Sequence, residues 1–463
     1  MIVKLTVIGG AGVRTPRLIP ALVKRAQRLQ LQELWLMDIN PTKLDLIGSL
    51  CIEIAHQLNA PFKIILTVHP EDAIRDADHI VTTIRPGFEQ GRAIDEKIAF
   101  RHGILGQETT GAGGFAMAMR SIPAILHYCQ LAEKLAPDAW IYNFTNPAGL
   151  VVQALHYAGI QRVVGICDSA NGAQNAASQY FDVPIHQVRH EVFGLNHLSW
   201  TRSVRLYTEA SAPNGEEVLP RLLDDSRFIS LTHMSMFHPI IREHKHMFLN
   251  EYLHYFYHRD EALKALLSKT ESRGEEVVRL TTELLEKLEE IPPSKHPSQA
   301  LNIYHEVMEK RNASYMAHAR HNEPRKNIKP HSEDSEGYAG VALGCIESLA
   351  SNTPHFTGLN VPNNGAITGL RNDDIIEVSC TVNSSGIQPI HIGNIPESEF
   401  SLVQSVKQYE RLAAQSILKR SRDLAIEALV AHPLVGSYPL SIRLIDEFIN
   451  AHRNDVGDWS PRV

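Results

Sequence analysis

Short runs of β-branched and aliphatic residues alternate with helical segments through the first part of the chain, and this alternation is what most restricts the fold. Strand-like runs cover 3–8, 34–37, 63–67, 79–84, 139–143 and 163–167, and helical spacing of apolar residues covers 17–29 and 43–58. Strands that alternate with helices build βαβ units and a parallel sheet with helices on both faces. We therefore predict an α/β fold that begins with a Rossmann-like, doubly wound domain over residues 1–195.

The pattern changes after residue 195. Long helical segments are predicted at 270–311 and 404–431, a strand at 375–382, and a polar surface loop at 323–336. We expect residues 196–463 to form a mixed α+β domain that completes the site and contributes to oligomerisation. The whole arrangement is then lactate/malate dehydrogenase-like.

Composition excludes several classes of protein. The 463 residues are 43% hydrophobic and 21% charged, as in ordinary globular domains rather than disordered or fibrous chains. A net charge of −7 argues against a nucleic-acid partner, because such proteins normally carry a basic face. Five scattered cysteines do not suggest a disulfide framework, and no apolar run approaches the roughly 20 residues of a membrane span. The first residues run directly into a strand without a signal-peptide pattern, so we expect a cytoplasmic protein.

A glycine-rich turn follows the first strand. Gly10-Ala11-Gly12 lies between strand and helix, where glycines let backbone N–H groups approach a pyrophosphate. Asp38 ends the second strand, where a carboxylate can accept hydrogen bonds from a ribose diol and would repel the extra phosphate of NADP. These residues predict NAD binding, and the alternative is a tight strand–helix turn without a ligand.

Three further segments place polar residues in loops or after buried strands. They are Gly106–Gly114 (GQETTGAGG), Asn143–Gly149 (NFTNPAG) and Cys167-Asp168, the last followed thirty residues later by His197. Thiolate and imidazole groups are ligands for divalent transition metals. Each segment also has an alternative without a ligand. Gly106–Gly114 could be a flexible surface loop, and Asn143–Gly149 could be an Asn-capped turn that starts a helix. Cys167 could be a buried free cysteine, and His197 could be a core histidine.

Together with 252–257 (YLHYFY) and 361–365 (VPNNG), these segments resemble the NAD- and metal-dependent glycosidases of glycoside hydrolase family four, over essentially the whole chain. This family is an exception to two-carboxylate glycoside hydrolysis. The resemblance implies hydrolysis of a 6-phospho-β-glucoside or a phosphorylated disaccharide. The steps are oxidation at C3 by NAD, deprotonation at C2, loss of the aglycone, addition of water and re-reduction, with Mn²⁺ or another divalent metal as Lewis acid.

The resemblance also implies residue roles and an assembly state. Tyr252 is the expected base at C2, and Asp168 is the expected acid for the departing oxygen. The other expected roles are metal ligation by Cys167 and His197, substrate binding by Arg92, Asn146 and Arg273, and cofactor binding by Gly10, Gly12 and Asp38. A homodimer or homotetramer is expected.

The resemblance places Ser169–Gly172 beside the sugar, and these residues depart from the pattern of close relatives. This departure leaves open a family member that acts on another anionic sugar, such as a uronate, or on an α-glycoside. Two readings from other classes also remain: a 2-hydroxy-acid dehydrogenase, which would need a histidine paired with a carboxylate, and a non-catalytic NAD-binding sensor.

Overall fold

The computed structural model of the chain describes residues 3–209, 211, 213–320, 337–351 and 353–460. The polar loop predicted at 323–336 lies outside these residues.

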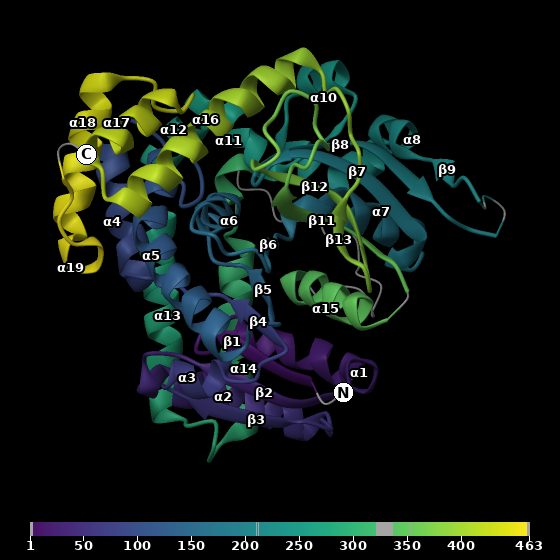
Figure 1. The fold of residues 1–463 in the computed structure, drawn as a ribbon, viewed down its shortest axis with the longest axis vertical. Coiled ribbons are helices and arrows are strands. Elements are labelled where there is room, and N and C mark those ends of the chain that lie inside the picture. Colours follow the sequence, from purple (N-terminus) through teal and green to yellow (C-terminus); the bar gives the residue numbers. More distant parts are fainter. Residues whose placement is uncertain (1–2, 210, 212, 321–336, 352, 461–463) are drawn as a thin grey trace.

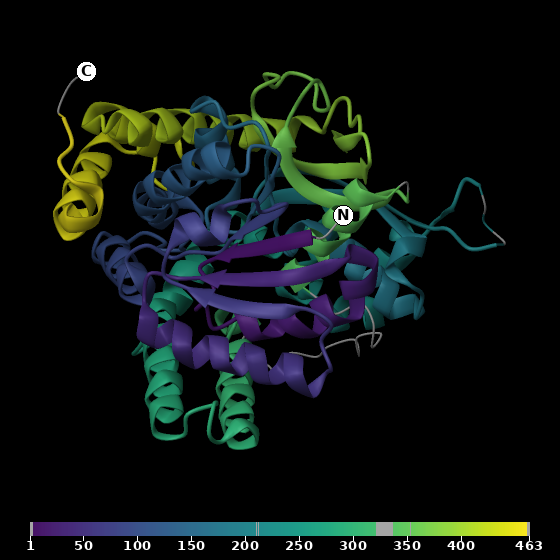
Figure 2. The same ribbon diagram turned by 60° about the horizontal axis from the view of Figure 1, so that its bottom comes forward.

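A nine-stranded sheet forms the centre of the molecule, in the order β13-β12-β11-β6-β5-β4-β1-β2-β3 (Figures 1 and 2). Its strands are β1 (Val3–Ile8), β2 (Leu31–Met37), β3 (Lys63–Thr67), β4 (His79–Thr82), β5 (Trp140–Asn143), β6 (Val163–Gly165), β11 (His355–Pro362), β12 (Ile375–Asn383) and β13 (Gly386–Pro389). The six strands from β1 to β6 pair in parallel, and β11 joins β6 antiparallel. The alternation of strands and helices therefore predicted the parallel part of the sheet correctly.

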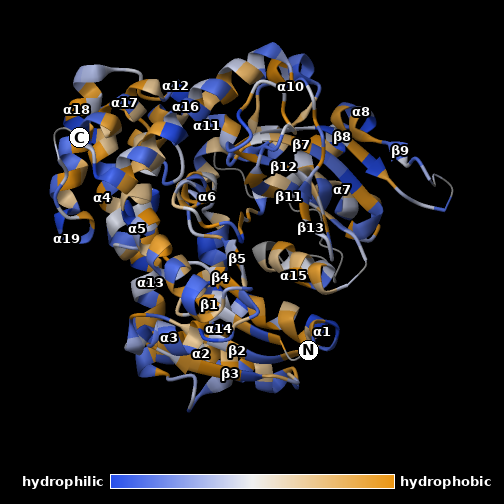
Figure 3. Cartoon of the chain, viewed as in Figure 1, coloured by the Kyte–Doolittle hydropathy of each residue, from blue (hydrophilic) through white to orange (hydrophobic). Residues whose placement is uncertain are grey.

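Burial explains why these runs form strands. Leu5, Val7 and Ile8 of β1 are all buried, as expected of a parallel strand covered by helices on both faces. Figure 3 shows hydrophobic residues along the strands of this sheet. The covering helices include α1 (Leu18–Leu29), α2 (Pro41–Gln57), α3 (Pro70–Ile74), α5 (Gly111–Leu135), α6 (Ala148–Tyr157) and α15 (Gly337–Ala350).

A smaller antiparallel sheet follows. It contains β7 (Val188–Leu195), β8 (Leu198–Leu206), β9 (Glu216–Glu217) and β10 (Phe248–Leu249). The longer helices around the two sheets are α4 (Phe88–Arg101), α7 (Gly172–Phe181), α12 (Arg259–Leu267), α13 (Arg273–Glu290), α14 (Pro297–Ala313), α16 (Glu397–Lys419), α17 (Arg422–Ala431) and α18 (Tyr438–Ala451). Shorter helical pieces are η1 (Thr15–Arg17), η2 (Ser169–Asn171), η3 (Ile185–Gln187), α8 (Leu219–Asp224), α9 (Ser226–Leu231), η4 (His233–Met236), α10 (Pro239–Lys245), η5 (Glu251–Leu253), α11 (His254–Tyr257), η6 (Ala317–Arg320) and α19 (Arg453–Val456).

The helix predicted at 404–431 is two helices, so that prediction was wrong, and the helical segment predicted at 270–311 contains two helices. The helix within 270–311 breaks at Pro292 and Pro293, since a residue before proline avoids the helical conformation and proline removes an N–H donor. The helix within 404–431 breaks at Arg420, whose φ of 49° ends α16, and Ser421 then caps α17.

The division predicted at residue 195 stays a prediction. The β7–β8 hairpin spans this position, and β11–β13 extend the sheet that the first segment begins. None of the helices among the described residues has both the length and the apolar character that crossing a membrane requires.

A buried ion network connects α4, α5 and the chain after α18. The Arg120 guanidinium, 2% exposed, donates to both carboxylate oxygens of Asp95 at 3.1 and 2.6 Å and to the carbonyl oxygen of Pro86 at 3.1 Å. His452 Nε2 lies 2.6 Å from the same carboxylate. Because Pro86 follows β4 and lines the central cavity, this network also supports the cavity wall.

We predict that Arg120→Met lowers the free energy of unfolding by about 3–5 kcal/mol, because it leaves the Asp95 carboxylate buried without its main partner. Urea unfolding followed by circular dichroism measures the change. The matched control is Arg101→Met on α4, since the pair between Arg101 and Glu447 is exposed and should contribute about 0–1 kcal/mol. Equal losses in the two variants would contradict the prediction.

Candidate active site

One cavity of about 790 Å³ lies at the carboxyl ends of the parallel strands. The loops after β1, β4, β5 and β6 supply part of its wall, and η5, α13 and α14 supply another part. Open α/β sheets bind ligands at this edge. Nine of the ten predicted site residues line it: Gly12, Asp38, Arg92, Asn146, Cys167, Asp168, His197, Tyr252 and Arg273.

The tenth predicted site residue, Gly10, packs against β2 and does not line the cavity. A Cβ added at Gly10 would lie 2.7 Å from Cβ of Leu36, so this glycine lets the turn pack against β2. Asp38 braces the same turn, because its Oδ2 accepts a hydrogen bond from the N–H of Ala11 at 3.1 Å. The turn leads into η1 and α1, and its arrangement fits a pyrophosphate beside Gly12 and a ribose near Asp38.

The predicted metal ligands are in contact although thirty residues separate them. Cys167 follows β6, and its Sγ lies 3.3 Å from Nε2 of His197. His197 occupies the two-residue turn between β7 and β8, with φ of 62°. For a metal such as zinc, nitrogen and sulfur donors at about 2.1 and 2.3 Å lie about 3.1–3.6 Å apart at ordinary coordination angles. The pair therefore fits one metal ion.

The GQETTGAGG segment holds the histidine ring. The Thr109 hydroxyl donates to Gln107 Oε1 at 2.6 Å and lies 2.6 Å from Nδ1 of His197, so it accepts the Nδ1 proton. The lone pair of Nε2 then points towards Cys167. A Cβ at Gly113 would lie 2.4 Å from the Gln107 carbonyl oxygen, so the glycines that open α5 allow this close packing. The segment is thus a rigid support rather than a flexible loop.

Protein groups alone do not complete a metal site. Among the described residues, no group of three histidine, cysteine or acidic side chains is arranged to hold a metal ion. Oδ1 of Asp168, next to Cys167, is buried without a hydrogen-bond partner. A metal held by Cys167 and His197 would therefore keep positions open for substrate oxygens, as catalytic sites do.

Tyr252 lies directly against the histidine. Its ring stacks on the ring of His197 with centroids 3.7 Å apart and planes inclined by 5°. The Tyr315 hydroxyl donates to the Tyr252 hydroxyl at 2.9 Å. Of the tyrosines in the 252–257 segment, Tyr252 is thus the one beside the predicted metal ligands. Tyr315 carried no sequence signal, since it lies in the turn after α14, outside the motifs.

Burial controls the protonation states. It lowers the pKa of His197 to about 4, which keeps the ring neutral as a ligand requires. Burial, with the Glu377 and Asp168 charges, raises the pKa of the Cys167 thiol. Burial also raises the pKa of Asp168 to about 6, although the Arg14 charge opposes this. Burial and the Glu251 charge raise the pKa of Tyr252, which the hydrogen bond from Tyr315 partly offsets.

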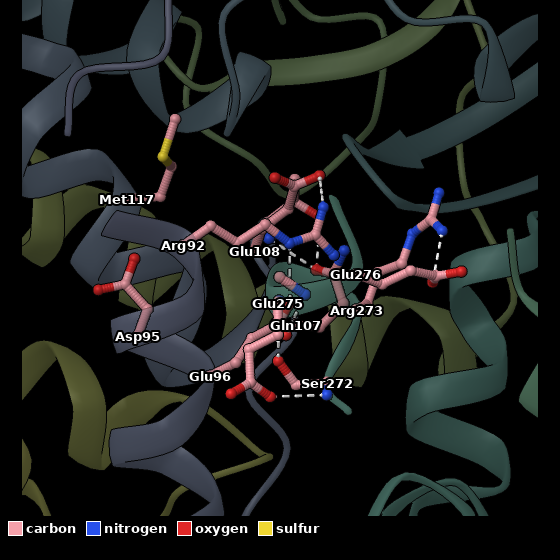
Figure 4. A network of polar contacts seen from close by, with 12 residues as sticks. Arg92, Asp95, Glu96, Gln107, Glu108, Met117, Ser272, Arg273, Glu275 and Glu276 are labelled. Atoms are coloured by element: carbon pink, nitrogen blue, oxygen red, sulfur yellow. Dashed lines mark hydrogen bonds and ion pairs between the residues drawn. The ribbon is translucent and has the colours of Figure 1, made fainter. Parts of the chain in front are cut away.

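The two predicted substrate arginines are held by carboxylates (Figure 4). Arg92 donates to Glu96 at 2.7 Å and pairs with Glu108 at 2.9 Å, while Arg273 donates to Glu276 at 2.7 Å. Burial would raise the pKa of Glu108, but the charges of Arg85 and Arg92 hold it below its ordinary value. Both arginines are therefore positioned on the cavity wall before any ligand arrives.

Two family models match the chain: "Family 4 glycosyl hydrolase" over residues 4–183 and "Family 4 glycosyl hydrolase C-terminal domain" over residues 192–435. A Bacillus subtilis protein named "Probable 6-phospho-beta-glucosidase" is 30% identical, over 97% of this chain and 96% of its own. A 6-phospho-beta-glucosidase of Escherichia coli is 27% identical, over 99% of this chain and 96% of its own.

A solved structure has the same fold. The 6-phospho-beta-glucosidase of Thermotoga maritima, determined with NAD and glucose-6-phosphate, aligns with a TM-score of 0.83 at 27% identity, over 98% of this chain and 99% of that one. The same enzyme was also determined with manganese. The resemblance inferred from the motifs is thus confirmed over both halves, and the chain belongs to the family 4 glycosyl hydrolases.

Proposed function

We propose that this chain is a 6-phospho-β-glucosidase that depends on NAD⁺ and a divalent metal, with Mn²⁺ as the first choice. The observation that carries the proposal is the single cavity lined by the glycine turn, the Cys167–His197 pair and Tyr252. Relatives named as 6-phospho-β-glucosidases, and the Thermotoga structure with its ligands, support the substrate and the cofactors.

When bound, NAD⁺ would supply a reversible hydride acceptor for C3 of the sugar, and the metal would supply Lewis acidity at the C2 and C3 oxygens. Gly12 and Asp38 would hold the dinucleotide, and Cys167 and His197 would hold the metal. Arg92, Asn146 and Arg273 would orient the sugar from the cavity wall.

Tyr252 would remove the proton from C2 once C3 is a ketone. Its hydroxyl is held by Tyr315, and its ring is held against His197, so the oxygen has a defined position. Asp168 would protonate the departing glycosidic oxygen. Burial keeps its pKa near 6, so the carboxyl retains a proton at higher pH than an exposed aspartate does.

The rival classes have less support. A 2-hydroxy-acid dehydrogenase needs a histidine paired with a carboxylate at the cavity, but the ring nitrogens of His197 contact Cys167 and Thr109. The pair between His452 and Asp95 does not line this cavity. A sensor without turnover would have no use for a base, an acid and a ligand pair around one cavity.

Activity on an α-glycoside stays an alternative, because some relatives are named as phospho-α-glucosidases. Activity on a uronate stays an alternative because of the departure at Ser169–Gly172. A cytoplasmic location fits a phosphorylated substrate, and the dimer or tetramer stays a prediction.

We expect release of 4-nitrophenol from 4-nitrophenyl β-glucoside 6-phosphate with Mn²⁺ and NAD⁺ far below the substrate concentration. NADH should not accumulate, because the hydride returns to the sugar. The plain β-glucoside should be roughly 30- to 1,000-fold poorer in kcat/KM, since phosphate contacts contribute about 2–4 kcal/mol. Release of 4-nitrophenol and absorbance of NADH are followed together. Stoichiometric NADH would indicate a dehydrogenase, and equal kcat/KM values would remove the phosphate from the proposal.

Tyr252→Phe should abolish turnover and the incorporation of deuterium at C2 in deuterated water, because the phenol oxygen takes that proton. Mass spectrometry of the released sugar measures the incorporation. Tyr257→Phe is the control, since Tyr257 accepts a hydrogen bond from Trp200 and does not line the cavity. Deuterium at C2 in the Tyr252 variant would assign the proton transfer to another residue.

Thr109→Val should weaken Mn²⁺ binding roughly 10- to 100-fold, because it removes the hydroxyl that orients the His197 ring. Titration followed by electron paramagnetic resonance of free Mn²⁺ gives the affinity without turnover. Thr110→Val is the matched control, because Thr110 makes no side-chain cap hydrogen bond. If Thr109→Val binds Mn²⁺ with unchanged affinity, the hydrogen bond between Thr109 and His197 does not contribute to metal binding.

A further inference from the structure

Arg311 occupies the last turn of α14 and lines the central cavity. Its backbone carbonyl accepts a hydrogen bond from Arg273 at 2.9 Å. Tyr315, which contacts Tyr252, follows one helical turn later. Arg311 therefore lies beside the proposed sugar site, next to the residues that support Arg273 and Tyr252.

The guanidinium of Arg311 has few partners among the described residues. One Nη1 contact reaches the Thr281 hydroxyl at 3.4 Å, which is long for a hydrogen bond. Its Nε is buried and has no hydrogen-bond partner. Arg92 and Arg273 differ, because each is paired with a carboxylate. Arg311 thus presents an unused donor inside the cavity.

The surrounding charges are mostly positive. Arg14, Arg85 and Arg273 face Arg311, and Glu89 is the nearby carboxylate that balances them. Glu89 is itself shared with Lys43 and Arg85. Burial, together with Arg14 and Arg85, lowers the pKa of Arg311 to about 9.

Arg311 is half-buried, and a partly buried cation among other cations is costly without a counter-ion. Arg85 and Arg273 already pair with Glu108 and Glu276. Arg14 and Arg311 form no ion pair within the part of the chain that the structure describes, so these two cations remain for an incoming negative charge.

We propose that Arg311 binds a phosphate group in this cavity. A guanidinium presents its donors as a planar fork that matches phosphate oxygens, and the neighbouring cations would favour a dianion. Two phosphates could supply this chemistry: the 6-phosphate of the sugar and the pyrophosphate of the dinucleotide. Both phosphates are ligands of the proposed function, so the inference rests on it. The test measures binding of each ligand separately.

The test compares the full chain with Arg311→Met, which keeps a long side chain without the charge. Isothermal titration calorimetry measures the affinity for glucose 6-phosphate in the presence of NAD⁺ and, separately, the affinity for NAD⁺. The matched control is Lys310→Met, which removes the adjacent and largely exposed cation from the same helix. We expect affinity for one phosphate ligand to fall on the order of 10- to 100-fold in Arg311→Met and to stay unchanged in Lys310→Met.

Thermal unfolding gives a second readout. Because Arg311 is repelled by its neighbours in the ligand-free protein, Arg311→Met should unfold at the same temperature as the wild type or higher. Inorganic phosphate should raise the unfolding temperature of the wild type more than that of the variant. A structural role for Arg311 would instead lower the unfolding temperature of the variant.

Loss of glucose 6-phosphate affinity alone assigns Arg311 to the sugar phosphate, and loss of NAD⁺ affinity alone assigns it to the pyrophosphate. The inference is overturned if Arg311→Met binds both ligands with wild-type affinity. It is also overturned if the variant loses affinity for both ligands and unfolds at a lower temperature than the wild type. If Arg311→Met does not fold, Arg311→Lys replaces it. Lysine keeps the charge but not the fork, so wild-type affinity for both ligands would likewise count against the assignment.

Failure of the proposed function would look different. A chain that binds glucose 6-phosphate through Arg311 but hydrolyses no phosphorylated glycoside would remove the function and keep the phosphate site. Arg311→Met could instead hydrolyse the 6-phosphate substrate at the wild-type kcat/KM and bind NAD⁺ with unchanged affinity. That result would keep the proposed function and remove the phosphate site at Arg311.

Discussion

The site depends on the common edge at which the parallel strands end. Because β1, β4, β5 and β6 pair in parallel, the loops after all four strands emerge on the same side of the sheet. That edge brings the glycine turn, Asn146 and Cys167 to one cavity although more than a hundred residues separate the first from the last. The antiparallel β7–β8 hairpin then adds His197 opposite Cys167. Without the parallel pairing, none of these groups would meet.

Around this edge, the protein keeps some charges paired and leaves others open. Arg92, Glu96 and Glu108 satisfy one another, and Glu96 also accepts the N–H of Gly274 at 2.6 Å, which joins α4 to the start of α13. In contrast, Oδ1 of Asp168 and Nε of Arg311 are buried with no hydrogen-bond partner among the residues that the structure describes. Buried polar groups are normally satisfied, so unsatisfied groups on a cavity wall indicate where ligand atoms belong. The paired charges form the support, and the open ones mark the contact points.

A second support surrounds the histidine. Asn196, the other residue of the hairpin turn, donates to Glu377 at 3.1 Å, and Ser199 donates to the same carboxylate at 2.7 Å. Burial raises the pKa of Glu377 to about 7. Glu377 lies on β12, so the far end of the central sheet holds the turn that carries His197. Interactions behind a metal ligand orient it, and the loss of one typically costs about 10- to 100-fold in metal affinity.

The sequence by itself determined the parallel strands, the glycine turn and the family, because these depend on local patterns of hydrophobicity and on motifs with fixed spacing. It also pointed to nine residues that line one cavity. It did not reveal the helix breaks at Pro292 and Arg420, where turn chemistry interrupts a continuous helical pattern. Nor did it reveal Tyr315, Glu377 or Arg311 as parts of the site, and it singled out the GQETTGAGG segment without revealing the role of Thr109. Their significance lies in which groups face them, and only the tertiary structure decides that, since it joins segments hundreds of residues apart and removes the water that would otherwise satisfy them.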